Sequence, residues 1–209
     1  MEPCVNIHTH RPTGRGIELH TAGIHPWEAD RHSVDALTAQ LEHREAPRSG
    51  ALPGDTIQAI GEIGLDFACK TDRAVQFDVL RRQLALARRL HLPVVLHCVR
   101  AFEPLMRELA ACEPRAVIFH GFIGSPEQAR QALARGYMLS FGARTFASPK
   151  SLRALHEVPL GQLFFETDDA PVPIEEIYAR ASEVLGLPVE TLQRATRENY
   201  ERIFEKQHG

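Results

Sequence analysis

The chain has few cysteines and no long apolar run, and both absences narrow the classes of protein to which it can belong. Its four cysteines, Cys4, Cys69, Cys98 and Cys112, form no CxxC pair, so zinc-finger spacing is absent and a disulfide framework is not expected. No apolar stretch approaches the roughly 20 residues that a bilayer requires. The N-terminus, MEPCVNIHTH, has neither the charged start nor the apolar stretch of a signal peptide. The sequence therefore predicts a cytoplasmic protein without a membrane partner.

The sequence also lacks a block of lysines and arginines. Its 24 Lys and Arg residues against 27 Asp and Glu give a net charge of −3, which argues against a large nucleic-acid surface. A few arginines beside a site would still bind a nucleic-acid end or a small phosphorylated substrate. The candidates are Arg11, Arg15, Arg100 and Arg144, each of which is also explained as solvated surface. A chain of 209 residues predicts a single domain spanning 1–209, and nothing in it demands more than a monomer.

Short apolar runs alternate regularly with helical patterns along the chain. Strands are expected at Cys4–His8, Ile17–Ile24, Thr56–Ile63, Pro93–His97, Ala116–His120, Tyr137–Phe141 and Gln162–Glu166. Helices are expected near residues 33–45, 72–91, 101–112, 126–135, 149–157, 174–185 and 189–206. The segment Arg44–Asp55, rich in Pro, Gly and Ser, is expected to be a surface loop. This alternation implies an α/β fold with a parallel sheet.

The number of strand-plus-helix units indicates a TIM-barrel-like (β/α) barrel. We count about seven units, whereas a full barrel has eight and about 250 residues. One βα unit is therefore predicted to be reduced or missing. The clearest helix signal is a capping box of Ser125 and Gln128 with Pro126 between them, followed by Gly136 at the expected helix end.

Five of the apolar runs end in side chains that can bind a metal ion. The runs are VNIHTH, IQAIGE, PVVLH, AVIFH and LFFETD, and they end in His8, His10, Glu62, His97, His120 and Asp168. The C-terminal ends of barrel strands all open onto one face, where active sites lie. We therefore expect these six side chains to converge on a metal site.

Each of these residues also has an ordinary structural explanation. His8 and His10 would share one face of a strand, but that face can also be solvated. A histidine after four apolar residues can be a hydrogen-bonded core residue, and Glu62 can pair with an arginine. Their repetition at the same place in successive units favours a metal. The residues alone do not say which acid of Glu166-Thr167-Asp168-Asp169 is the ligand.

The ligand types indicate the metals and the reaction. Imidazole and carboxylate together suit Zn, Mn, Fe or Ni, and Mg where oxygen dominates; Mg, Mn and Zn are the ions we expect. Six ligands exceed the three protein ligands of a single catalytic zinc, so we predict two divalent ions. Such pairs acidify a bound water and clamp both oxygens of an in-line displacement. Glu62 and one acid of the segment 166–169 would be the catalytic carboxylates, holding the water or accepting its proton.

Seven strings along the chain resemble, in order, the signatures of the TatD-type metal-dependent hydrolases. They are NIHTH, GIHPW, GEIGLD, LHCVRAF, FHGFIGS, FFETDDAP and ENYERIF. The resemblance covers nearly the whole chain and implies a TIM-barrel-like fold with a two-metal site. It implies that His8, His10 and Asp168 hold one ion and that His97 and His120 hold the other. It further implies that Glu62 bridges the ions, that His25 contacts substrate, and that the activity is that of a deoxyribonuclease acting on DNA ends.

The chain departs from the family pattern at several positions. Asn6 replaces the usual Asp two residues before the first histidine, and Gly121 replaces a Cys. Arg100, a predicted substrate contact, stands one residue later than in the family's HCR pattern, and Asp169 adds an acid after ETD. Residues 11–24 are too few for the helix and strand that the family places there, which identifies the missing unit.

Two other functions remain open from the sequence. One is a metal-dependent amide or ester hydrolase of the same barrel class, although no lysine replaces Glu62 as a carbamylated bridge. The other is a non-catalytic binding protein with a degenerate site, for which Asn6 and the missing unit are the reasons. Two residues also keep two interpretations: Asp66 orients a ligand or caps a loop, and Trp27 stacks on a base or packs under its loop.

Overall fold

The computed structural model describes residues 2–42 and 57–205, which form two compact units. Unit 1 combines both ends of the chain, Met1–Leu19 and Ile118–Gly209, and unit 2 is the middle segment His20–Val117. The predicted loop Arg44–Asp55 lies outside the described residues. The predicted single domain and monomer stay predictions.

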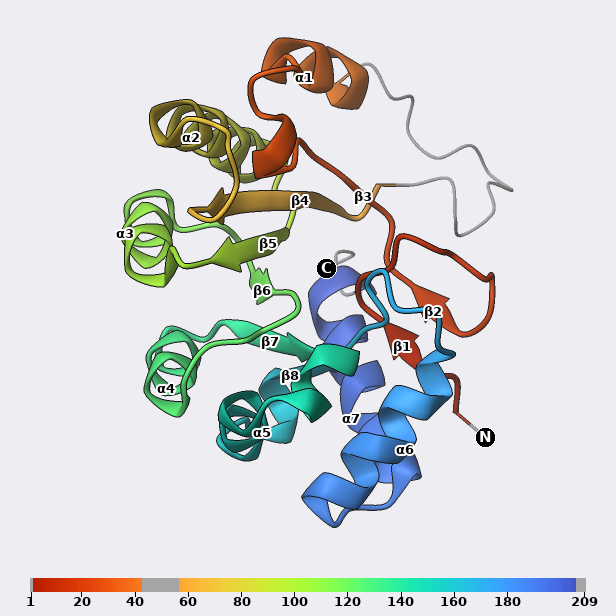
Figure 1. Ribbon diagram of the computed structural model, residues 1–209. Coiled ribbons are helices and arrows are strands. Elements are labelled where there is room, and N and C mark those ends of the chain that lie inside the picture. The colour runs from red at the N-terminus through yellow and green to blue at the C-terminus, as the bar shows by residue number, and fades with distance from the viewer. Residues whose placement is uncertain (1, 43–56, 206–209) are drawn as a thin grey trace, which may run out of the picture. The chain divides into compact units, whose positions relative to one another are not determined.

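Unit 2 is built on three parallel strands, β3 (Thr21–Ala22), β4 (Ala59–Asp66) and β5 (Val94–Val99), with β4 in the middle. Its helices are α1 (Val34–Glu42), α2 (Arg73–Arg89) and α3 (Phe102–Cys112), preceded by the short turn η1 (Pro26–Glu28). Figure 1 shows α2 and α3 beside β4 and β5. β4 is apolar except at Glu62 and Asp66, as expected for a strand covered on both faces.

The start of α2 shows why the helix begins where it does. The Asp72 carboxylate accepts hydrogen bonds from the backbone N–H groups of Ala74 and Val75, at 2.8 and 3.3 Å, which satisfies donors that the first turn leaves unpaired. Arg88 and Arg89 in the last turn complement the negative end of the helix dipole. Local residues therefore fix both ends of α2.

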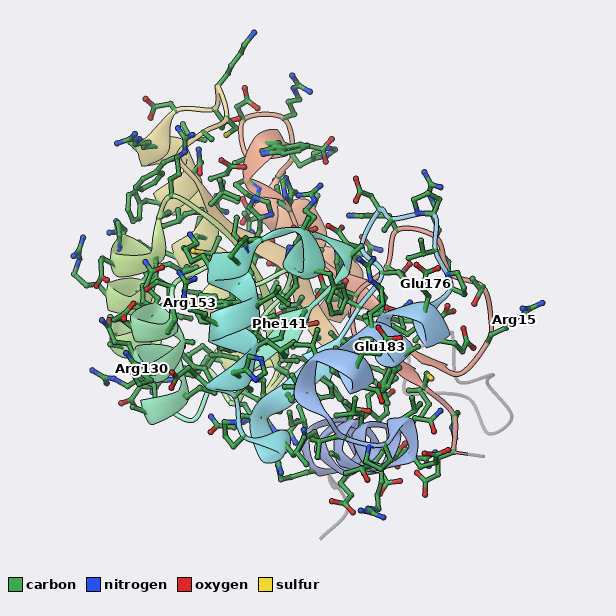
Figure 2. All side chains as sticks on the ribbon, turned by 60° about the horizontal axis from the view of Figure 1, so that its bottom comes forward. Arg15, Arg130, Phe141, Arg153, Glu176 and Glu183 are labelled. Carbon is green, nitrogen blue, oxygen red and sulfur yellow. The ribbon has the colours of Figure 1, made fainter. Side chains whose placement is uncertain are left out.

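Unit 1 contains β1 (Val5–Asn6), β2 (Ile17–Glu18), β7 (Met138–Phe141), β8 (Leu163–Phe165) and the last residues of β6 (Val117–Phe119). All of their pairings are parallel: β1 with β2, β6 with β7, and β7 with β8. A hydrogen bond of 3.0 Å from Ile7 N to Phe165 O joins β1 to β8. Phe141, fully buried, lies among the ribbons of this unit, and Arg15 extends away from them (Figure 2).

The α-helices of unit 1 are α4 (Pro126–Ala134), α5 (Pro149–His156), α6 (Ile174–Leu185) and α7 (Val189–Tyr200). Two 3₁₀ helices, η3 (Ala143–Ala147) and η4 (Leu160–Gln162), and a π-helix, η5 (Glu201–Glu205), accompany them. The predicted capping box of α4 is confirmed, since Ser125 and Gln128 each accept a bond from the other's backbone. Gly136 follows α4 with φ +77°, a conformation that glycine adopts without steric cost.

Strand β1 is fixed by a buried phenol of α6. The Tyr178 hydroxyl accepts a hydrogen bond from Val5 N at 3.1 Å and donates one to Val5 O at 3.0 Å. Both residues are fully buried, and burial raises the pKa of the Tyr178 phenol, so it stays protonated. This one side chain satisfies both backbone groups of Val5.

We expect Tyr178→Phe to lower the free energy of unfolding by about 1–3 kcal/mol, because it leaves the buried N–H and C=O of Val5 unsatisfied. Urea unfolding at neutral pH measures the change. The control is Tyr137→Phe, the same deletion at a half-buried position. Equal stability of the two variants would contradict the role given to Tyr178.

The structure confirms the predicted α/β class and the order of its elements, with one strand divided in two. The segment Ile17–Ile24, expected as one strand, is wrong as such: β2 pairs with β1, whereas β3 pairs with β4. The two halves pair with different neighbours, so the strand is interrupted. Residues 7–20 contain no helix, in agreement with a reduced βα unit. Among the described residues, no helix combines the length and the apolar character that a membrane crossing demands.

Candidate metal centre

The backbone of unit 1 brings the N-terminal histidines to Asp168. Asp168 N donates to His8 O at 3.1 Å, and His10 N donates to Asp168 O at 3.0 Å. These bonds form a parallel bridge between Thr9 and Asp168. Backbone hydrogen bonds alone therefore bring His8 and His10 next to Asp168, and no side-chain contact is needed to hold them there.

Three side chains of unit 1, those of His8, His120 and Asp168, have ligand atoms within 4.8 Å of one another. His8 Nε2 and His10 Nε2 lie 3.6 and 3.5 Å from the same oxygen, Asp168 Oδ1. These distances are long for hydrogen bonds. Atoms that each lie 2.0–2.2 Å from one tetrahedral ion are roughly 3.3–3.6 Å apart, so the spacing fits a shared cation.

Glu166, which the sequence alone did not single out, lies behind His120. Its Oε1 is 3.3 Å from His120 Nδ1, and the side chain is fully buried. Burial by itself raises the pKa of Glu166, but the charges of His120 and His8 and the bond to His120 lower it below the ordinary value. A carboxylate that orients a ligating histidine is the usual outer partner of a metal site.

The donor chemistry around Glu166 fits a divalent ion. Its second oxygen, Oε2, is buried and has no hydrogen-bond partner among the described residues. A buried, ionised carboxylate requires a compensating positive charge nearby. Glycine makes room for it, because a Cβ at Gly121 or Gly142 would come within 3.2 Å of Glu166.

In unit 2, Glu62 lies where the pairing of β4 with β5 is irregular. The register between β4 and β5 shifts between Ile60 and Ile63, and such bulges redirect a side chain. Because β4 continues to Asp66, Glu62 lies within the strand and not at its end as expected from the sequence. Gly64, with φ +146°, pairs with His97 so closely that a Cβ there would collide with the His97 carbonyl.

Two histidines contact one oxygen of Glu62. Its Oε1 is 2.7 Å from His97 Nδ1 and 3.3 Å from His25 Nε2, and the three residues form a second group with ligand atoms within 4.8 Å. His25 Nδ1 accepts a bond from Trp27 N at 3.2 Å. That bond assigns the His25 proton to Nε2, which faces Glu62.

Asp66 contacts His97 and caps a loop; the cap is confirmed, and its role in orienting a metal ligand stays a prediction. Its Oδ2 lies 3.0 Å from His97 Nε2 and accepts a bond of 2.7 Å from Trp27 Nε1. Its Oδ1 accepts from the backbone of Ala68 and Cys69. Burial raises the pKa of Asp66, but the bonds from Trp27 and His97 lower it below the ordinary value. Trp27 itself is 57% exposed.

Two buried side-chain amides of α2 fix the backbone next to His25 and at Asp66. Gln83 accepts from Ile24 N at 2.6 Å and donates to Ile24 O, which places the following residue, His25. Gln76 does the same for the backbone of Asp66. Neither role was predicted from the sequence, where the available signal was two glutamines seven positions apart on one face of a helix.

Asn6 has a structural role that explains its side chain. Asn6 Nδ2 donates to Thr167 Oγ1 at 2.9 Å, and Thr167 N donates to Asn6 Oδ1 at 3.0 Å. An amide supplies both a donor and an acceptor, whereas an ionised Asp supplies acceptors alone. Asn6 therefore joins β1 to the residue before Asp168.

The remaining predicted residues have simpler surroundings. Arg100 follows β5, is exposed and has φ +53°; its substrate contact stays a prediction. Arg144 lies 3.6 Å from Asp169, which gives that extra acid a partner. Burial raises the pKa of the Cys98 thiol to about 12, as suits a packing residue. The division of six ligands between two ions, with Glu62 as the bridge, also stays a prediction.

Comparison with known proteins identifies a family that the chain matches. A family model described as "TatD related DNase" matches residues 15–205. "Uncharacterized metal-dependent hydrolase YjjV" of Escherichia coli is 34% identical over 160 residues, 73% of this chain and 58% of that protein. Human "Deoxyribonuclease TATDN3" is 30% identical over 91% of this chain and 76% of its own length. "3'-5' ssDNA/RNA exonuclease TatD" of Cronobacter sakazakii is 35% identical over 71% of this chain and 56% of its own length.

The fold is similar to that of a solved relative. The crystal structure of YjjV from Escherichia coli matches with a TM-score of 0.78 and 26% identity, over 90% of this chain and 77% of that one. The match confirms the predicted TIM-barrel-like fold class. The chain spans little more than half the length of two of these relatives, 58% and 56%.

Proposed function

The chain belongs to the TatD family of metal-dependent hydrolases, and from this premise we propose that it is a two-metal phosphodiesterase acting on DNA ends. The observation that carries the proposal is the presence of a histidine–carboxylate group in each unit, His8, His120 and Asp168 in one and His25, Glu62 and His97 in the other. Relatives named deoxyribonuclease and exonuclease support the substrate class.

Six side chains would hold the ions. They are His8, His10, His120 and Asp168 of unit 1 and Glu62 and His97 of unit 2. Divalent ions in such a site lower the pKa of water from 15.7 towards about 7 and neutralise the charge of a phosphodiester in the transition state. Mg, Mn and Zn all suit a mixture of imidazole and carboxylate ligands.

The protein's own groups would direct the reaction. Glu62, only 7% exposed, would accept a proton from the attacking water, since its oxygen faces the site and not bulk solvent. Asp168 would hold that water in position. His25, whose Nε2 carries the proton, would donate a hydrogen bond to a phosphate oxygen. Asp66 and Glu166 would keep His97 and His120 in their ligating orientations.

The test is hydrolysis of single-stranded DNA by metal-stripped protein refilled with Mg, Mn or Zn. Oligonucleotides labelled at the 3′ or the 5′ end report which end is shortened. We expect no shortening in EDTA and stepwise shortening from one end after refilling, with two metals per chain by mass spectrometry. Two bound metals without cleavage by any ion would rule out DNA as the substrate. No bound metal would rule out the metal centre.

A further inference from the structure

The loop between β1 and β2 has a fixed shape. The carboxylate of Glu18 accepts hydrogen bonds from Thr13 N, Thr13 Oγ1 and Gly14 N at 2.9–3.1 Å. Gly16, with φ +72°, lies so close to Cys4 that a Cβ would approach the Cys4 carbonyl oxygen to 2.5 Å. The Glu18 carboxylate thus fixes the loop backbone, and the side chains of Arg11 and Arg15 on this loop are exposed.

This loop forms one wall of a cavity of about 440 Å³ in unit 1. The wall consists of Arg11, Thr13 and Arg15, and the floor is Asn6 and Thr167. The lining is completed by the segment 170–175, which includes the start of α6. A cavity of this size accommodates a nucleotide-sized group.

The charges around the cavity favour an anion. Neither Arg11 nor Arg15 forms an ion pair with an acid within the part of the chain that the structure describes, and Glu18 is occupied by the loop backbone. The N-cap of α6 is Pro173, which makes no side-chain hydrogen bond, so the positive end of this helix faces the cavity uncapped. Glu175 is the one acid of the lining. Glu175 and Glu176 both lie in the first turn of α6 and offset the positive helix end. Among the lining residues, the two guanidinium groups of Arg11 and Arg15 still outnumber the one carboxylate of Glu175, which leaves a net positive site.

The floor of the cavity belongs to the chain segment that carries the candidate metal ligand Asp168. Thr167 precedes Asp168, and its hydroxyl donates to Thr9 Oγ1 at 2.9 Å. Thr9 lies between His8 and His10. A group bound in the cavity would therefore lie one residue layer from the candidate ligands of unit 1.

We propose that this cavity binds a backbone phosphate of the substrate strand, adjacent to the bond that is cleaved. Arg11, directly after His10, is the principal contact through its planar pair of N–H donors. Arg15, which extends outward from the loop (Figure 2), forms the outer rim. This subsite rests on the proposed function for its substrate, but its chemistry requires a phosphodiester and no particular base.

The test compares Arg11→Ala and Arg11→Lys with the matched control Arg153→Ala, which removes an exposed arginine of α5 in the same unit. Binding of a fluorescent single-stranded oligonucleotide is measured in EDTA, so that no cleavage occurs, from 50 to 200 mM salt. Inorganic phosphate serves as the competitor. Steady-state cleavage by metal-loaded protein gives KM and kcat.

We expect Arg11→Ala to weaken oligonucleotide binding about tenfold, the loss of one charge-assisted contact. The slope of log K against log salt should fall by about 0.7, the value for one phosphate contact with a single strand. KM should rise with kcat nearly unchanged. Arg11→Lys should restore the salt slope but not the full affinity, and Arg153→Ala should match the unsubstituted protein.

Each alternative outcome decides the question. Equal binding and equal salt slopes for Arg11→Ala and Arg153→Ala would overturn the subsite, even if the protein cleaves DNA. Binding that depends on Arg11 without cleavage by any metal form would support the subsite and refute the nuclease function. A protein that binds neither the oligonucleotide nor phosphate would overturn the subsite.

Discussion

Replacement of Glu62 by Gln is expected to lower kcat for oligonucleotide cleavage about 10³-fold. Glu62 Oε1 lies 2.7 Å from His97 Nδ1 and 3.3 Å from His25 Nε2. The carboxylate would bind metal through one oxygen and take the proton of the attacking water through the other. Gln has nearly the same shape but accepts no proton at neutral pH. General-base catalysis contributes typically 10²–10⁴-fold, which sets the magnitude.

The control for Glu62→Gln is Glu103→Gln, the same change at an exposed position of α3 in unit 2. Circular dichroism and the midpoint of urea unfolding verify that both variants fold. Metal content is measured together with kcat, because loss of metal and loss of the base have different signatures. Near-normal turnover of Glu62→Gln at full metal content would remove Glu62 from the reaction.

The second large effect is expected from Glu166→Gln, which should weaken metal binding 10–100-fold. Glu166 is buried behind His120 and fixes its ring through Nδ1. The amide loses the negative charge that strengthens a ligating imidazole, and outer carboxylates of this kind typically contribute a factor of that size. Calorimetric titration of the metal-stripped protein with Zn measures the change in metal affinity.

Glu183→Gln on the exposed side of α6 is the matched control (Figure 2). Adding excess metal separates the two roles that Glu166 can have. We expect excess Zn or Mn to restore most of the turnover of Glu166→Gln, because the residue orients a ligand and does not contact substrate. Unchanged metal affinity would contradict this role, as would a loss of kcat that excess metal does not relieve.

Much of the fold was predictable because local patterns determine it. Helix α4 begins and ends where its capping box and its glycine predict, as Ser125, Gln128 and Gly136 show. The exception is instructive. Ile17–Ile24 has the composition of one strand, but pairing with β1 on one side and β4 on the other divides it. Pairing partners are a non-local property that composition does not encode.

The sequence by itself determined which residue types are available for metal chemistry, because a histidine or an acid after an apolar strand is visible in the order of the residues. Only the tertiary structure decided which acids contact which histidines. Asp168 was distinguished from Glu166 by main-chain pairing with His8 and His10, and Glu166 was placed behind His120. Asp66, Gln76 and Gln83 obtained their roles in the same way. These contacts join residues far apart in the chain, and their geometry depends on strand register and packing, which no local pattern specifies.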